Sequence, residues 1–141
     1  MYQTMSYDEQ LKMKAGQVKK LLDTAISSAG QVDAEGKPDY VFEGITGSPK
    51  QWAFRNKMEF SFGDEFKDGP LTLGMHKRGS FYDIVTVDQC VLVHPDCCKI
   101  LRATLDYFTE HGAVYYKKMA HVGYLRHLLL RRGVTSGEIL V

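Results

Sequence analysis

Hydrophobic and polar residues alternate along residues 53–62, AFRNKMEFSF. Such alternation predicts a half-buried β-strand, because successive side chains of a strand point to opposite faces of the sheet. On this reading the apolar face, which begins one residue earlier, carries Trp52, Phe54, Met58, Phe60 and Phe62, with Asn56 as its polar interruption. The other face carries Arg55, Lys57, Glu59 and Ser61, and therefore two cations two positions apart.

Four more segments have the composition of strands. LTLGMHK (71–77) and FYDIVTV (81–87) are bounded by turn residues and predict, with the first strand, an antiparallel meander. YLRHLLLRRG (124–133) and EILV (138–141), joined by the turn VTSG, predict two further strands. Alternation places His127 and Arg131 on one face of the 124–133 strand and Arg126 on the other.

Two segments have helical periodicity. SYDE at residues 6–9 is a capping box, and apolar residues at three- and four-residue spacing predict a helix over residues 6–29. The second helix is expected over residues 94–112, with Pro95 at its first position, Gly112 at its end, and a buried stripe of Cys97, Leu101, Leu105 and Phe108. Residues 31–50, rich in Gly, Pro and Asp, predict a connector with a short edge strand at 40–42.

These elements predict an α+β fold in which an antiparallel sheet packs with two main helices. A chain of 141 residues fits a single domain, here a helix at 6–29, the connector and a sheet and helix body over 51–141. The net charge of +1 argues against a strongly basic nucleic-acid binder, although it permits a local basic patch. The sequence has neither an apolar run long enough to cross a membrane nor a signal peptide, so we expect a cytoplasmic protein without membrane partners.

Basic residues gather on the expected strands. An antiparallel sheet can bring these side chains into one stripe that binds a phosphate backbone. The alternative is a solvated outer face whose charges limit edge-to-edge aggregation. The residues concerned are Arg55, Lys57, His76, Lys77, Arg78, Lys117, Lys118, Arg126, His127, Arg131 and Arg132.

The three cysteines do not form a disulfide framework or a paired zinc motif. Cys97 lies in the first turn of a helix, where the dipole can lower a thiol pKa and favour a nucleophile, as in a small cysteine hydrolase. The alternative is that Cys97 and Cys98 are small buried hydrophobes. The chain also has no glycine-rich nucleotide motif, so we identify no catalytic or cofactor-binding residue in it.

Four segments, in this order, resemble the TrmA/RumA-type RNA uridine-C5 methyltransferases. They are YQTMSYDEQLKMK (2–14), FRNKMEF (54–60), LGMHKRGSFYDIVTVDQCVLVHP (73–95) and GYLRHLLLRRGVTSGEILV (123–141). In that family an RNA-binding barrel precedes a central domain, and an S-adenosylmethionine domain that carries the catalytic residues follows it. The resemblance implies that residues 1–141 are the central domain of such an enzyme, separated from its other domains and inactive alone. The end of the chain within an expected strand agrees with a piece of a longer protein.

The resemblance also implies roles for individual residues. The substrate of the parent enzyme would be rRNA or tRNA, and the RNA-binding residues of this chain would be Arg55, Lys57, His76, Lys77, Arg78, Arg126, His127 and Arg131. Aromatic residues such as Phe81, Tyr82 or Tyr124 would add stacking to RNA bases. Cys90 matches the fourth ligand of the 4Fe-4S cluster that many family members hold. Two alternatives remain open, a non-catalytic RNA-binding module and a sheet face that docks on the domains absent from this chain.

Overall fold

The computed structural model describes Tyr2 and residues 4–141. Gln3, part of the first segment with the family resemblance, and Met1 lie outside the described residues. The chain divides into two compact units, Met1–Gln51 and Trp52–Val141. No helix in the described part of the chain is long and apolar enough to cross a membrane.

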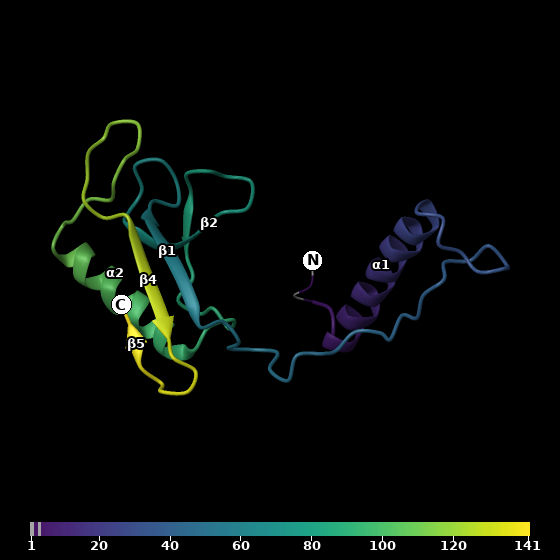
Figure 1. Cartoon of the computed structure of the whole chain (residues 1–141). Coiled ribbons are helices and arrows are strands. Elements are labelled where there is room, and N and C mark those ends of the chain that lie inside the picture. The colour runs from purple at the N-terminus through teal and green to yellow at the C-terminus, as the bar shows by residue number, and fades with distance from the viewer. Residues whose placement is uncertain (1, 3) are drawn as a thin grey trace. The chain divides into compact units, whose positions relative to one another are not determined.

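The described residues of the second unit form a five-stranded antiparallel sheet of order β3-β2-β1-β4-β5 (Figure 1). The strands are β1 (Lys57–Gly63), β2 (Thr72–His76), β3 (Ile84–Thr86), β4 (His127–Arg132) and β5 (Ile139–Leu140). The meander β1-β2-β3 is the expected one, and β4 pairs with the free edge of β1. With one helix in each unit, the α+β class predicted from the sequence is confirmed.

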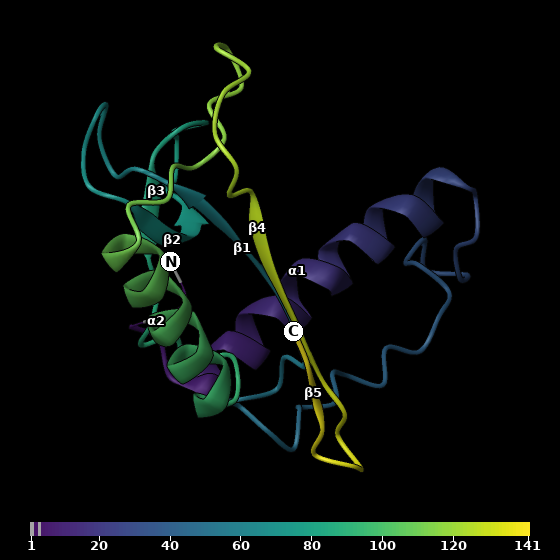
Figure 2. The ribbon, with the colours of Figure 1, turned by 90° about the vertical axis from the view of Figure 1, so that its left-hand side faces the viewer.

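Helix α2 (Pro95–Glu110) covers one face of this sheet, as Figure 2 shows. The side chain of His94 accepts a hydrogen bond from the backbone N–H of Asp96, so that it caps the helix, and Pro95 occupies the first turn as expected. The predicted stripe is confirmed, because Cys97, Leu101 and Leu105 are buried and Phe108 packs partly buried beside them. The sheet contributes Met58, Phe60, Phe62, Leu73, Leu128 and Leu130 to the same core.

The predicted strand at 53–62 begins later than its alternation indicates. Met58, Phe60 and Phe62 are buried as expected, whereas Trp52 and Phe54 are 61% and 54% exposed. The backbone at Ala53 has φ of 50°, and the N–H groups of Ala53 and Arg55 bond to the carbonyls of Val91 and Leu92. The backbone N–H groups of Ala53 and Arg55 therefore pair with the loop preceding α2 instead of with the sheet. The placement of Trp52 and Phe54 on the buried face is wrong.

The neighbouring strands are also shorter than predicted. Residues 77–83 form a loop closed by bonds from the N–H of Lys77 to the Asp83 carbonyl and from the N–H of Ser80 to the Lys77 carbonyl. The loop leaves Phe81 and Tyr82 exposed. Residues 113–125, called the 113–125 loop below, extend beyond the end at which β4 begins (Figures 1 and 2).

The first unit contains α1 (Tyr7–Ser28) and the connector that follows it. The predicted capping box is present, because Ser6 Oγ accepts from the N–H of Glu9 and the Glu9 carboxylate accepts from the N–H of Ser6. The connector runs back along the helix, with the hydroxyl of Tyr40 donating to Asp23 at 2.6 Å and the N–H of Ser48 donating to the Tyr7 hydroxyl at 2.6 Å. The predicted edge strand at 40–42 is absent from these described residues, since side chains of α1 hold the segment in place of a partner strand.

Candidate functional site

The face of the sheet that does not contact α2 carries polar and charged side chains. Lys57 of β1 lies directly opposite Arg131 of β4, and Ser61 lies opposite His127. These four residues alternate with the buried residues of their strands, so they share one face. We call this face the open face of the sheet. Lys57 lies on the outer face as predicted, and the predicted sharing of one face by His127 and Arg131 is confirmed.

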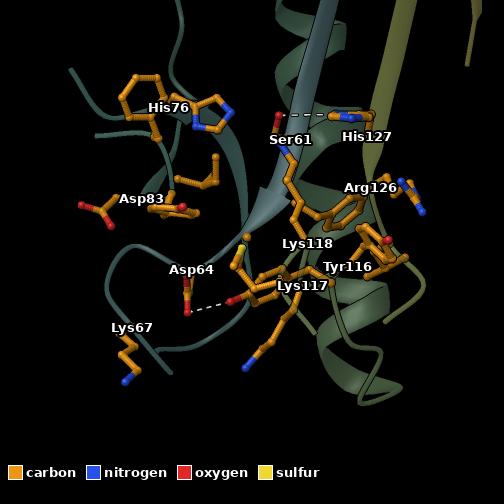
Figure 3. A pocket seen from close by; sticks show the side chains of 18 of the residues that line it. Ser61, Asp64, Lys67, His76, Asp83, Tyr116, Lys117, Lys118, Arg126 and His127 are labelled. Carbon is orange, nitrogen blue, oxygen red and sulfur yellow. Dashed lines mark hydrogen bonds between the residues drawn. The ribbon is translucent and has the colours of Figure 1, made fainter. Parts of the chain in front are cut away.

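A cavity of about 510 Å³ lies at the end of the open face where β1 finishes and β4 begins. Five short segments converge on it: the end of β1 with the turn after it, the end of β2, the loop before β3, the 113–125 loop and the start of β4. Figure 3 shows its labelled polar side chains. Its lining consists of residues 61–64, Lys67, Asp68, His76, residues 81–84, residues 115–119 and residues 125–127.

The structure brings together only part of the predicted set. His76, Arg126 and His127 line the cavity, whereas Lys57 and Arg131 lie toward the other end of the open face. Lys77 and Arg78 are exposed in the 77–83 loop and do not line the cavity.

The expected pairing of Arg55 with Lys57 on one face is wrong. Arg55 precedes β1, and its Nη1 atom lies 3.4 Å from the sulfur of Met58, a buried residue on the α2 side. The physical reason is the late start of the strand. Alternation holds only where the backbone is extended, and here the extended strand starts at Lys57.

One wall of the cavity is fixed by a buried carboxylate. Asp64 is 7% exposed and accepts hydrogen bonds from the hydroxyl of Tyr115 at 2.9 Å and from the N–H of Asp68 at 2.9 Å. Burial, followed by the hydrogen bond to Asp64, raises the pKa of Tyr115 to about 12. Tyr115 therefore stays protonated at neutral pH and ties the 113–125 loop to the turn after β1.

The opposite part of the lining is a stacked pair. The guanidinium carbon of Arg126 lies 3.6 Å from the centre of the Tyr116 ring, and the Tyr116 hydroxyl lies 2.9 Å from Nδ1 of His121. Figure 3 shows Arg126 and Tyr116 side by side. Arg126 departs from simple alternation, because it precedes β4 and lies over an aromatic ring of the 113–125 loop. It can therefore line the same cavity as His127.

Lys67, Tyr116 and Met119 were not predicted at a site from the sequence, and Lys117 and Lys118 were predicted only as members of a basic stripe. The signal was the run YYKKM at 115–119, in which aromatic and cationic residues are adjacent, a composition typical of nucleic-acid contacts. It was missed because it lies in a loop, where strand alternation does not apply.

The 113–125 loop is bridged by backbone pairing of Tyr115 with Leu125 and of Lys117 with Val122. Gly123, with φ of 106°, allows the close approach because a side chain there would overlap the Tyr115 carbonyl.

The cysteines do not form a reactive site. Cys97 is 4% exposed, and burial raises the pKa of its thiol, so the structure argues against the nucleophile considered for it. Burial also raises the pKa of the Cys98 thiol, which donates to the backbone carbonyl of Cys90. Across residue 2 and residues 4–141, no three His, Cys, Asp or Glu side chains are grouped to hold a metal ion. Cys90 is half-buried and is not part of a disulfide.

The chain is similar over nearly its whole length to proteins named RNA methyltransferases. An uncharacterized RNA methyltransferase of Caldanaerobacter subterraneus subsp. tengcongensis is 41% identical over 140 residues, which are 99% of this chain and 29% of the relative. One from Clostridium tetani is also 41% identical over 140 residues, 99% of this chain and 28% of the relative. The chain thus spans less than a third of the length of these relatives. No family model matches it.

A solved structure has the same fold. The Pyrococcus abyssi tRNA (uracil-54, C5)-methyltransferase, in complex with S-adenosyl-L-homocysteine, matches with a TM-score of 0.66 and 22% sequence identity. The match covers 97% of this chain and 29% of that protein. The two proteins therefore share the fold of this segment.

Proposed function

We propose that this chain is the central, RNA-positioning part of an S-adenosylmethionine-dependent RNA uridine-C5 methyltransferase that acts on rRNA or tRNA. The observation that carries the proposal is the 41% identity, across 99% of the chain, to proteins named RNA methyltransferases. The fold shared with a protein named a tRNA uracil-C5 methyltransferase supports the choice of uridine C5.

The proposal divides the work between this segment and the rest of a longer protein. Methyl transfer and S-adenosylmethionine binding belong to the other parts, because we identify no glycine-rich nucleotide loop in this chain and its Cys97 thiol is buried with a raised pKa. The segment alone should therefore bind RNA without methylating it. From the family resemblance we also propose Cys90 as a ligand of a 4Fe-4S cluster whose other three ligands come from outside the described residues.

The open face supports the RNA-positioning role. Lys57 and Arg131 lie opposite each other at one end, and His127 lies further along β4 toward the cavity. Glu59 lies on the same face, with its carboxylate 3.9 Å from His127 Nδ1, so the cross-strand pair of Lys57 and Arg131 is the part of the face that can bind phosphate. Each phosphate neutralised makes binding more sensitive to salt. A face used only for docking on other protein domains would not contribute to RNA binding or to its dependence on salt.

The enzymatic part of the proposal is tested with a full-length protein that carries this segment. It is incubated with labelled S-adenosylmethionine and total RNA that lacks 5-methyluridine, and the nucleosides are separated by mass spectrometry. We expect label in 5-methyluridine. Label in another nucleoside would reject uridine C5, and RNA binding without any label would favour the non-catalytic RNA-binding module.

The role of the open face is tested by fluorescence anisotropy of this chain with an RNA stem-loop at several salt concentrations. Lys57→Ala and Arg131→Ala should weaken binding and each reduce the salt slope by about one. The matched control is Lys99→Ala, which removes an exposed lysine from α2, the helix that covers the other face. Unchanged binding in Lys57→Ala and Arg131→Ala would assign this face to contacts with other domains.

A further inference from the structure

We propose that the cavity between β1, β4 and the 113–125 loop binds one unpaired nucleotide of single-stranded RNA. The base would stack on the aromatic and guanidinium surfaces, and the adjoining phosphates would contact the lysines. This inference rests on the proposed function, and it narrows the substrate from RNA in general to an unpaired stretch.

The size of the cavity fits a single nucleotide. Its volume of about 510 Å³ is within the range of roughly 300–1,000 Å³ that small-molecule pockets occupy. A double helix cannot enter such a space, since its bases are stacked on one another and do not present their faces. An unpaired nucleotide can leave its stack and present both the face and the edge of its base.

The lining provides surfaces on which a base can stack. Arg126 and Tyr116 form a flat cationic pair at one side, held in position by the contact of Tyr116 with His121. Phe81 and Tyr82, which are 89% and 70% exposed, lie at the loop before β3 and line the same cavity. Aromatic rings exposed to this degree cost hydrophobic free energy, so their position beside cations indicates a ligand with a π-face.

The charges of the lining favour an anion despite three carboxylates. Asp64 is already bonded to Tyr115 and to the N–H of Asp68, and Asp68 pairs with Lys117 at 3.2 Å. Lys67, Lys118 and Arg126 line the cavity together with Asp83. Among the described residues, Lys67 and Lys118 form no ion pair, so a phosphate at the rim can contact both. The Asp83 carboxylate can accept a hydrogen bond from a base N–H group.

The direct test compares two RNAs by fluorescence anisotropy with this chain. One is a fluorescein-labelled single strand of 12 nucleotides, and the other is the same strand annealed to its complement. We expect the single strand to bind at least about tenfold more tightly. Tyr116→Ala, Arg126→Ala and Phe81→Ala should each weaken it by about fivefold or more, because stacking contributes about 1–3 kcal/mol per base.

The controls separate a stacking role from a structural one. Tyr116→Phe keeps the ring and loses only the contact with His121, so it should weaken binding by less than Tyr116→Ala does. Tyr107→Ala removes another exposed tyrosine, which stacks on His111 at the end of α2, and should leave binding unchanged. The circular dichroism spectrum of each variant confirms that it is folded, and Phe81→Ala keeps the test valid where Tyr116→Ala does not fold.

The outcomes distinguish this inference from the proposed function. Equal binding of single strand and duplex, or unchanged binding in all three alanine variants, overturns the nucleotide pocket and leaves an RNA-binding segment in place. Binding of neither RNA overturns the pocket and also contradicts the RNA-positioning role of this segment. Methyl transfer by the longer protein is measured separately and does not depend on either result.

Discussion

The hydroxyl of Tyr115 donates a 2.9 Å hydrogen bond to the carboxylate of Asp64, a residue 51 positions earlier in the chain. The bond joins the turn after β1 to the 113–125 loop and so holds together two of the segments that line the cavity. Asp64 is 7% exposed, and a buried carboxylate requires hydrogen-bond donors. The shape of the cavity thus depends on this pair.

Replacing Tyr115 by phenylalanine removes one of the two donors to Asp64. We expect Tyr115→Phe to lower the free energy of unfolding by about 1.5–3 kcal/mol at pH 7, the usual loss for a hydrogen bond to a charged group. Urea denaturation followed by circular dichroism measures the change. Tyr124→Phe, at a tyrosine that is largely exposed, is the matched control and should change the stability by less than about 0.5 kcal/mol.

The same pair predicts a dependence of stability on pH. The pKa of Tyr115 is raised to about 12 in the folded protein, above the ordinary value of about 10. Between these values the unfolded chain has lost the proton that the folded chain keeps, so stability falls as the pH rises. The stability difference between wild type and Tyr115→Phe should be constant below about pH 10 and shrink toward pH 12. A difference that is constant up to pH 12 would show that Tyr115 ionises as freely in the folded protein as in the unfolded chain.

The late start of β1 has a measurable consequence for stability. Phe60 is fully buried between the sheet and α2, and Phe54 is more than half exposed, although both lie on the same face of the alternating pattern. Phe60→Ala should lower the free energy of unfolding by about 3–5 kcal/mol, and Phe54→Ala by less than about 1 kcal/mol. Urea denaturation of the two variants measures the difference. Equal losses would mean that the strand continues back through Phe54.

Periodicity predicted the helices and the strand centres well, because burial against α2 sets the pattern at Met58, Phe60 and Phe62. It failed at the ends of elements. The positive φ of Ala53 and its bond to Val91 redirect the chain before β1, and this long-range pairing leaves no local signal. The capping box at Ser6 and Glu9 was predictable because each of its hydrogen bonds lies within four residues.

The candidate site was less predictable than the fold. His127 and Lys57 were assigned correctly to the open face from strand alternation alone. The stacking of Arg126 on Tyr116 depends on the path of the 113–125 loop, which alternation does not describe. Residues in loops reach a site through the three-dimensional path of the chain, so the composition of YYKKM was the only guide in the sequence.

Replacing each of two glycines by alanine should change stability in opposite directions. A side chain at Gly74 of β2 would overlap the carbonyl oxygen of Val85 in β3, so Gly74→Ala should separate these strands and lower the free energy of unfolding by more than about 2 kcal/mol. Gly16 lies within α1, and apart from its neighbours and the backbone of its own helix no described atom lies within 4 Å of an added Cβ. Gly16→Ala should therefore increase the helicity of α1, because alanine is favoured over glycine by about 1 kcal/mol. Hydrogen exchange of the amides in β3 and α1 measures both effects.

The burial of Cys97 predicts that its thiol reacts slowly with thiol-modifying reagents. The pKa of this thiol is raised chiefly by burial, so at pH 8 a smaller fraction of it is thiolate than in a free cysteine. Burial also leaves a thiol-modifying reagent little access to the sulfur. Two single-cysteine proteins allow a direct comparison: Cys90→Ser/Cys98→Ser retains Cys97, and Cys97→Ser/Cys98→Ser retains half-buried Cys90.

In each protein the reaction with Ellman's reagent is followed by absorbance at pH 8. Cys97 should react about tenfold more slowly than Cys90, and 6 M urea should abolish the difference by exposing both thiols. The Cys97 rate in the folded protein should also keep rising as the pH passes the ordinary value for a thiol. Rapid modification of Cys97 that is already maximal at pH 7 would contradict its burial and restore the nucleophile that the structure argues against.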